Sequence, residues 1–445
     1  MVLILSKNMP WHILIVCVSA SFLVPFMSSS ITIALWSISD SFNIDVAIAN
    51  WVANAFLVSL AASILPVGRV ADWIGRGRVF VYGLAIFSLS SFLSAITPSF
   101  PLLILFRVLQ GIGGACISAT SIAILSTVFP PSIRGRVIGF NTASVYTGLT
   151  LGPILGGFLV DYLGWRSLFL FVSIISAIGF IFSRNILDIG RVAVPLPSLY
   201  RMCLLAFSIA SIVYGASRIN EVYGFLLTLS GVILLIILLY LESLVDIGII
   251  GRKLLRNRFY MGASLANLLN YTATYALAIL VSLYLQRIRG FTAREAGLIL
   301  SSRPIVQALL SPITGFISDK YRPSIIASTG LCVIAFGIYY LMPLAISTMI
   351  TKILYALLIL GLGYALFSAP NTTAAMNASP RKLYGTAYAF LGSMRFLGQA
   401  ISTSIAIAVT KNTPNMINAI NTTIWIYLFI ALFATISTTI IRSKR

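Results

Sequence analysis

The sequence predicts an all-α polytopic membrane protein. Of its 445 residues, 59% are hydrophobic and only 9% are charged, and the mean hydropathy is +1.01. A soluble domain carries roughly 25% charged residues, so a water-soluble fold cannot bury this much apolar surface. Helices satisfy their own backbone hydrogen bonds, and they are therefore the elements expected to cross a bilayer here.

Fourteen apolar stretches are each near the ~20 residues that a bilayer requires, and we expect all of them to be membrane-spanning helices. They cover residues 11–35, 48–68, 79–97, 101–126, 137–160, 166–183, 200–216, 222–241, 259–285, 295–317, 324–343, 350–369, 384–409 and 420–441. We expect an N-terminal six-helix bundle in 1–184, two inserted spans and a cytoplasmic linker in 185–258, and a C-terminal six-helix bundle in 259–445. The segment 241–258 is expected to form an amphipathic helix on the cytoplasmic surface.

The basic residues predict the orientation. If the N-terminus is cytoplasmic, the inside segments hold 20 Lys and Arg residues and the outside segments hold 7. This positive-inside bias predicts that both termini are cytoplasmic, in a protein of the cell membrane. The net charge of +20 is scattered over these loops rather than gathered on one patch, so no nucleic-acid partner is expected.

Residues for catalysis or metal binding are not evident. The four cysteines fall within apolar stretches without a C-x-x-C pair, and the single histidine, His12, stands near the start of the first span. No nucleophile–base set and no nucleotide-binding loop is present, so we expect no catalytic residue, no metal and no cofactor. A membrane enzyme or sensor is therefore disfavoured.

Two loops share one pattern. Residues 68–78 read GRVADWIGRGR after an apolar span, and residues 315–321 read GFISDKY after another. Glycines permit a tight turn and close helix approach, the aspartate can cap a helix or pair with a base, and the basic residues stay in water. The pattern indicates a duplicated unit, whose candidate gating residues are Gly68, Asp72, Gly75, Arg76 and Arg78 in the first copy and Gly315, Asp319 and Lys320 in the second.

Spans four and five carry unusual residues. Arg107 stands about two turns into an apolar helix, where a charge is costly, so it should face a cavity or a partner unless it snorkels to an interface. In the next span, glycines four residues apart make one smooth helix face, and a proline bends the helix. These residues are Gly148, Gly152, Pro153, Gly156 and Gly157, and a plain packing groove is the alternative to a functional bend.

These stretches carry a family resemblance that covers nearly the whole chain. GRVADWIGRGR resembles the loop 2–3 signature of the major facilitator superfamily, LFRVLQGIGGA resembles its span 4 motif, and GLTLGPILGG resembles its antiporter motif in span 5. Together with the two inserted spans, they resemble the fourteen-span drug:proton antiporter family. The resemblance implies proton-driven efflux of amphipathic compounds by alternating access. It also implies that Asp72, Arg76 and Arg78 gate the cytoplasmic side, that Arg107 takes part in proton coupling and that Gly148–Gly157 form the antiporter bend.

The chain departs from that family in span 1. Met27 stands where family members commonly have an aspartate, and none of the ten acidic residues is expected at mid-membrane. Arg303 and Arg395 interrupt two later spans instead. If they face the cavity together with Arg107, an anionic or neutral substrate fits better than a cation; snorkelling to an interface is the alternative.

Polar and aromatic residues within spans are candidates to line the substrate cavity. Helix–helix hydrogen bonding is the alternative for each of them. As a group they indicate a mixed apolar and polar pocket, which suits amphipathic compounds. Besides Arg303 and Arg395, the candidates are Thr32, Asn54, Gln110, Asn141, Asn267, Asn270, Tyr271, Tyr275, Gln307, Asn371 and Gln399.

The leading interpretation is a secondary active exporter of small amphipathic compounds, driven by protons. Its expected partners are a small-molecule substrate, protons and the lipid bilayer, and we expect a monomer. The alternative is a carrier specific for an organic anion or metabolite on the same scaffold, with or without proton coupling. The missing acid in span 1 and the three arginines within spans favour that alternative.

Overall fold

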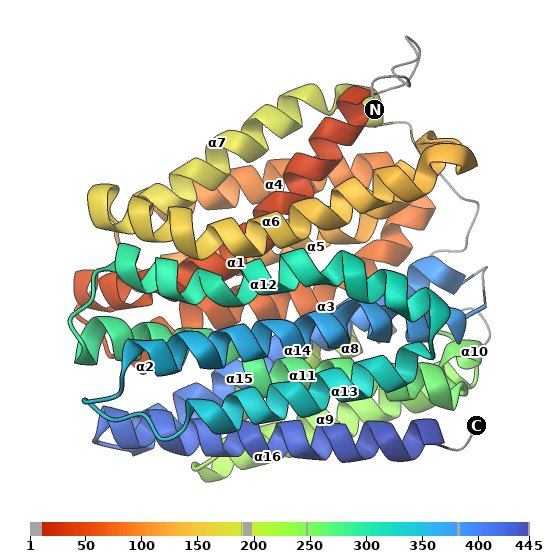
Figure 1. The fold of residues 1–445 in the computed structure, drawn as a ribbon. Coiled ribbons are helices and arrows are strands. Elements are labelled where there is room, and N and C mark those ends of the chain that lie inside the picture. Colours follow the sequence, from red (N-terminus) through yellow and green to blue (C-terminus); the bar gives the residue numbers. More distant parts are fainter. Residues whose placement is uncertain (1–10, 188, 190–197, 246–247, 381–382, 444–445) are drawn as a thin grey trace.

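The computed structural model describes residues 11–443 apart from 188, 190–197, 246–247 and 381–382. Every regular element in this part of the chain is helical, and most helices run side by side along one direction (Figure 1). Both chain ends lie at the same end of the bundle. We call this end the terminal face, and the end at which the first helix stops the opposite face.

The first part of the chain folds into six long helices with two short elements. Their bounds are α1 (Trp11–Ser41), α2 (Val46–Ala49), α3 (Trp51–Ile74), α4 (Arg76–Ile96), α5 (Phe100–Val128), α6 (Pro131–Leu163), α7 (Arg166–Phe182) and the 3₁₀ turn η1 (Arg184–Ile186). Two further long helices and one turn of helix follow: α8 (Leu199–Ala216), α9 (Val222–Ser243) and α10 (Arg252–Leu255).

The last part repeats the six-helix arrangement. It comprises α11 (Arg258–Leu283), the π-helical turn η2 (Tyr284–Ile288), α12 (Ala293–Lys320), α13 (Pro323–Leu341), α14 (Ile350–Asn377), α15 (Tyr384–Asn412) and α16 (Met416–Ser443). Each long helix coincides with most of one of the fourteen expected stretches.

Twelve helices in the described part of the chain are long and apolar enough to cross a membrane. Two of the fourteen expected spans are not among them. The helix α7 has only 17 residues, and α15 is 29 residues long but interrupted by polar side chains such as Arg395, Gln399 and Ser404. The findings therefore support a multi-pass protein with twelve candidate spans.

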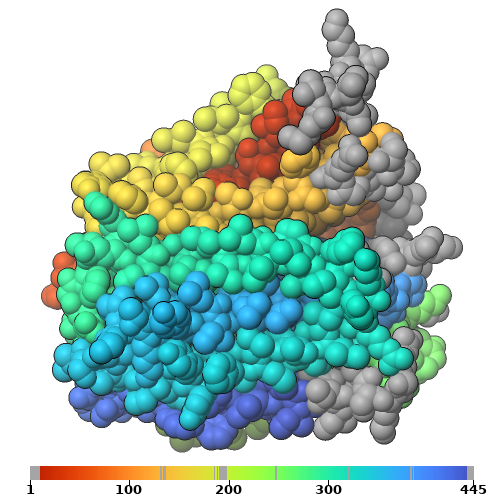
Figure 2. All heavy atoms as spheres, in the orientation of Figure 1, coloured from red at the N-terminus to blue at the C-terminus, as the bar shows by residue number. Residues whose placement is uncertain are grey.

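The helices α1–α7 pack on one another, and so do α11–α16; we call these two groups the halves. They meet mainly along two interfaces, α6 against α12 and α3 against α15, and α1 makes smaller contacts with α11 and α12. Figure 2 shows α6 and α12 side by side at the surface. The inserted helix α8 packs on both α3 and α15, and its Val213 carbonyl accepts a hydrogen bond from Ser404 at 2.8 Å.

Burial separates the inner helices from the outer ones. Phe26, Met27 and Ile31 in the middle of α1 are completely buried. By contrast, α9 presents Ile236 and Tyr240 to the outside, each at least 60% exposed. An apolar surface of this kind suits contact with lipid.

The expected amphipathic helix over 241–258 is wrong. α9 ends at Ser243, and between α9 and α11 the described residues form one helix, the four-residue α10. Gly251 has φ +87°, a conformation that interrupts a helix. Ile249 and Ile250 are buried rather than lying on a surface.

Candidate functional site

The loop between α3 and α4 is a tight turn held by an ion pair. Gly75 has φ +115° and separates the two helices, as only glycine does readily. Arg76 lies across the turn from Asp72, with Nη2 and Oδ1 2.9 Å apart. The turn rests on η1, because a Cβ on Gly77 would lie 1.7 Å from the Ile186 carbonyl oxygen. Sequence reasoning missed Gly77, whereas a Cβ on Gly68 would meet nothing within 4 Å.

The second copy of this pattern is built differently. α12 runs through Gly315 and ends at Lys320, and a Cβ on Gly315 would meet nothing within 4 Å. The Lys320 ammonium lies 4.8 Å from the centre of the Phe316 ring. The side chain of Asp319 lies outside the described part of the chain. The two copies therefore share a sequence pattern without sharing the tight glycine turn.

Arg107 is completely buried in the first half, so it does not snorkel to an interface. Its Nε donates to the Val52 carbonyl at 2.7 Å, and its Nη1 donates to Gln110. The guanidinium also lies 4.4 Å from the centre of the Phe56 ring, a cation–π contact. Gln110 in turn donates to Ser91 at 2.6 Å. Within the described residues Arg107 forms no ion pair with a carboxylate, so its charge is held by a carbonyl, an amide and a ring.

The glycines of α6 face two different neighbours. A Cβ on Gly148 would lie 2.5 Å from the Phe22 carbonyl, and one on Gly152 would lie 1.8 Å from Ser29 Oγ, so this face packs on α1, as does that of Gly156. Gly157 faces α12 instead, where a Cβ would lie 2.6 Å from the Ala293 carbonyl. On the other side of that interface, a Cβ on Gly297 would lie 2.1 Å from the Pro153 carbonyl oxygen. The glycine run therefore joins the halves as well as two helices of one half.

Side-chain hydrogen bonds between the halves gather toward the opposite face. Both Asp161 oxygens accept from the first backbone amides of α12, Ala293 N at 3.0 Å and Arg294 N at 2.8 Å. Asn54 donates to Ser404 at 3.0 Å and accepts from Thr403 at 2.9 Å. Further such bonds on this side are Gln286 to the Ile33 carbonyl at 3.2 Å and Tyr275 with Ser28 at 3.0 Å.

Toward the terminal face the contacts become sparser. Ser393 donates to the Ala61 carbonyl at 3.0 Å near mid-helix. Tyr146 of α6 and Ser368 of α14 lie 3.5 Å apart, also within their helices. Closer to the terminal face, residues near the ends of α3 and α15 line a small hollow. The structure is thus closed between the halves at the opposite face and looser at the terminal face.

Aromatic rings and guanidinium groups meet in the middle of the second half. The Arg303 guanidinium lies 4.3 Å from the centre of the Tyr364 ring, and the Tyr271 ring packs edge-on against Tyr364 at 5.9 Å. Arg303 also donates to the Thr274 carbonyl at 3.3 Å. Tyr271 lies within electrostatic range of both Arg303 and Arg395. Neither arginine forms an ion pair with a carboxylate among the described residues.

The remaining candidates differ in the hydrogen bonds that they form. Asn54, Asn267 and Asn371 donate from their amides to neighbouring helices, Asn267 to the Leu391 carbonyl at 2.8 Å and Asn371 to the Ala263 carbonyl at 3.0 Å. Thr32 bonds back to the Ser29 carbonyl of its own helix. Other buried amide atoms find no partner among the described residues; they belong to Asn141, Asn270 and Gln399. Gln307 is buried in α12.

Sequence reasoning missed several residues of this region. Tyr364, which connects Arg303 to Tyr271, stands in the glycine-rich stretch GLGYALFSAP, and an aromatic residue among glycines is the signal that points to it. Tyr146 and Ser368 have no comparable signal. The sequence gives no signal for Ser28 beyond its place next to Met27, and its side chain contacts Tyr275 across the halves.

Comparison with known proteins gives one family. The model of the Major Facilitator Superfamily matches residues 17–266 and 263–444. The riboflavin transporter RibZ of Clostridioides difficile is 25% identical over 402 residues, which cover 88% of this chain and 87% of that protein. The multidrug resistance protein Stp of Mycobacterium tuberculosis is 27% identical over 382 residues, which cover 84% of this chain and 71% of that protein.

The fold is also found among solved structures. A crystal structure of a D-xylose-proton symporter superimposes with a TM-score of 0.71, covering 96% of this chain and 97% of that one. The two sequences are only 16% identical, so this likeness concerns the fold alone.

Proposed function

The chain belongs to the major facilitator superfamily, and from this premise we propose that it is a secondary active transporter that exports small amphipathic molecules by alternating access. The observation that carries the proposal is the uneven contact between the halves. They are bonded to each other at the opposite face, through Asp161 and Asn54, and are looser at the terminal face. A transporter whose halves rock about a central site must pass through such a one-sided state.

The positive-inside rule assigns the faces. Arg69, Arg76, Arg184 and Lys320 all lie at the terminal face, which we therefore place in the cytoplasm of a cell-membrane protein acting as a monomer. On this assignment the described state is open toward the cytoplasm. We place α7 and α15 across the membrane as well, since they run alongside the twelve candidate spans, which gives fourteen spans and two six-helix halves flanking α8 and α9.

We take the substrate site to be the cluster of Tyr271, Arg303, Tyr364 and Arg395. Flat rings beside cations, together with buried amides that lack partners, can hold a molecule that is partly aromatic and partly polar. The multidrug relative favours a broad range of such molecules. We propose that the proton gradient drives export and that Arg107 takes part in the coupling to protons. The Asp72–Arg76 turn then serves as a cytoplasmic gate. Met27 rules out a carboxylate at its own position.

Expression in a host that lacks its own efflux pumps tests export directly. We expect growth protection against several unrelated lipophilic compounds, lost on addition of a protonophore and lost in the Asp72→Asn variant. Membrane levels of each variant would be measured alongside. A well-expressed protein that protects against none of the compounds would contradict multidrug export.

A carrier specific for an organic anion is the second candidate function. Arg303 and Arg395 favour it, because each places a guanidinium group within the bundle without a carboxylate partner among the described residues. The relative described as a riboflavin transporter is consistent with a single organic substrate.

Transport of labelled aromatic anions into proteoliposomes, with and without a pH gradient, separates the two candidates. For an anion carrier we expect Arg303→Gln and Arg395→Gln each to weaken apparent affinity roughly 30-fold, since each leaves a negative charge unpaired. Arg166→Gln is the control, because Arg166 is exposed at the opposite face. Equal uptake by all three variants would exclude a role of the two arginines in binding.

A further inference from the structure

One carboxylate of the protein is completely buried at the terminal face. Glu242 stands one residue before the end of α9, and none of its surface is exposed. Burying an ionised carboxylate is costly unless its oxygens are fully hydrogen-bonded. Its Oε1 accepts from Arg201 Nη1 of α8 at 3.1 Å, and its Oε2 accepts from the backbone amides of Ile250 at 2.8 Å and Gly251 at 3.1 Å.

The residues that follow fold around this carboxylate. We call residues 248–251 the linker loop. A Cβ on Gly248 would lie 2.2 Å from Glu242 Oε2, so a larger residue would displace the carboxylate. Gly251 has the left-handed φ of +87°, and its amide donates to the same oxygen. Arg201 is steadied in turn, because its Nε donates to the Tyr200 hydroxyl at 2.8 Å. Glu242 therefore fixes the shape of the linker loop.

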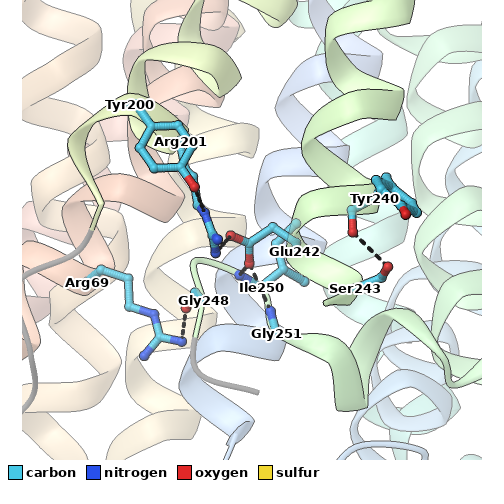
Figure 3. Close-up of polar contacts among 9 residues, drawn as sticks. All are labelled: Arg69, Tyr200, Arg201, Tyr240, Glu242, Ser243, Gly248, Ile250 and Gly251. Atoms are coloured by element: carbon cyan, nitrogen blue, oxygen red, sulfur yellow. Dashed lines mark hydrogen bonds and ion pairs between the residues drawn. The ribbon is translucent and has the colours of Figure 1, made fainter. Parts of the chain in front are cut away.

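The other side of the linker loop contacts the gate region. Arg69 of α3 donates to the Gly248 carbonyl, as Figure 3 shows beside the Glu242 contacts. Arg69 stands three residues before Asp72, which holds the α3–α4 turn. The buried carboxylate on α9 is thus connected, through the loop backbone, to the helix that carries the candidate gate.

Ile249 lines the hollow between the halves at the terminal face. It is 2% exposed, and Asp72 of α3 and Thr386 of α15 line the same hollow. The two helices contact each other directly at Ala61 and Ser393. Closer to the terminal face, Ile249 stands beside the hollow that lies between them.

We propose that Glu242 holds the linker loop so that Ile249 keeps the terminal ends of α3 and α15 apart, which favours the state closed at the opposite face. The device rests on the proposed function, since only an alternating transporter needs the two ends to approach. Closing the terminal face requires Ile249 to leave, and that requires the Arg69–Gly248 and Glu242 bonds to rearrange. The inserted helices α8 and α9 thereby set the balance between the two states.

Distances between spin labels on the full chain, without substrate, test this. Cys203 and Cys332, the exposed cysteines, would first be replaced by serine. One label pair reports the terminal face (Trp73→Cys with Tyr388→Cys), and another reports the opposite face (Asp40→Cys with Ile346→Cys). In each variant we expect the terminal pair to move to shorter distances and the opposite pair to longer ones.

Two variants and one control make the test specific. Glu242→Gln places an amide N–H donor against the groups that already donate to this side chain, which are Arg201 and two amides of the linker loop. Ile249→Ala shortens the side chain that lines the hollow and leaves the backbone bonds to Glu242 in place. We expect each to change the ratio of the two states roughly tenfold. Glu221→Gln is the matched control, since Glu221 pairs with Arg218 and Lys411 at the other end of α9, and it should change nothing.

Unchanged distances in a monodisperse Ile249→Ala protein would overturn the proposal, even if Glu242→Gln failed to fold. Because no substrate is used, the distances answer this question separately from transport. A shift in distances by a protein that transports nothing would refute the proposed function while supporting the role of the loop. Transport by a protein whose distances stay unchanged would support the proposed function while refuting the role of the loop.

Discussion

The opposite and terminal faces join the same two halves by different means. At the opposite face, backbone approaches backbone at Gly157 and Gly297, and Asp161 caps the first turn of α12. At the terminal face, the halves are separated by a hollow and by the linker loop, which is held through side chains. Contacts between backbones tolerate no added atoms, whereas contacts through side chains can rearrange. The closed face thus combines tight backbone packing with side-chain hydrogen bonds between the halves, whereas the looser face has a hollow and a loop held by Glu242.

The largest effect should come from filling the glycine contact at the closed face. A Cβ on Gly157 meets three backbone atoms of Ala293 and Arg294 within 3.1 Å, so Gly157→Ala should push α6 from α12 and abolish transport. Gly139→Ala is the matched control on the same helix, since nothing lies within 4 Å of its Cβ. There alanine should keep transport and raise the melting temperature slightly. Equal transport by both variants would show that this contact does not matter.

Arg107 stabilises the first half near the opposite face. Its Nε holds the Val52 carbonyl near the start of α3, so Arg107→Ala leaves both that carbonyl and Gln110 without their donor. We expect a loss of about 2–4 kcal/mol in stability, seen as a melting temperature lower by several degrees, together with loss of transport. The exposed Arg166, which also donates to a carbonyl, is the control. A stable Arg107→Ala protein without transport would instead point to a role in coupling alone.

Asn54 tests the closed face at the α3–α15 interface. Asn54→Ala removes the bonds to Thr403 and Ser404, each worth about 1 kcal/mol net. We expect the closed population at the opposite face to fall roughly tenfold, measured with the same Asp40 and Ile346 labels. Transport should slow rather than stop. Adding Thr403→Val to Asn54→Ala should have little further effect, because the shared bond is already lost.

The smallest effect is expected from Glu221 at the rim of the opposite face. A hydrogen bond from Lys411, together with one from Tyr223, lowers the pKa of this carboxyl to about 2. A carboxyl with a lowered pKa stabilises the fold above its unfolded pKa of about 4.3, and this contribution is lost as pH falls toward 2. Glu221→Gln should therefore leave the pH dependence of transport between pH 5 and 8 unchanged. A shifted profile would contradict this assignment.

Apolar runs and glycine spacing predicted the helices closely, since a helix in lipid is determined locally by length and hydropathy. The α3–α4 turn, the burial of Arg107 and the close glycine faces of α6 could also be expected, because they too are determined by residues close together in the sequence. The linker loop could not, because its shape depends on Glu242 meeting amides eight and nine residues later. Which polar residues face a neighbouring helix, as Asn267 and Asn371 do, likewise depends on how helices distant in sequence are rotated about their axes.

The inserted pair gives the molecule two unlike flanks. α8 packs on both helices of the α3–α15 interface, whereas α6 and α12 lie side by side at the surface (Figure 2). Phe158 of α6 and Leu298 of α12 are exposed apolar side chains. An apolar molecule diffusing in the bilayer would therefore meet the boundary between the halves at the α6–α12 flank, and not at the flank that α8 covers. On the proposed function, lateral entry of substrate from the bilayer would take place at the α6–α12 flank, and bilayer thickness or lipid composition would act on the protein mainly from that flank.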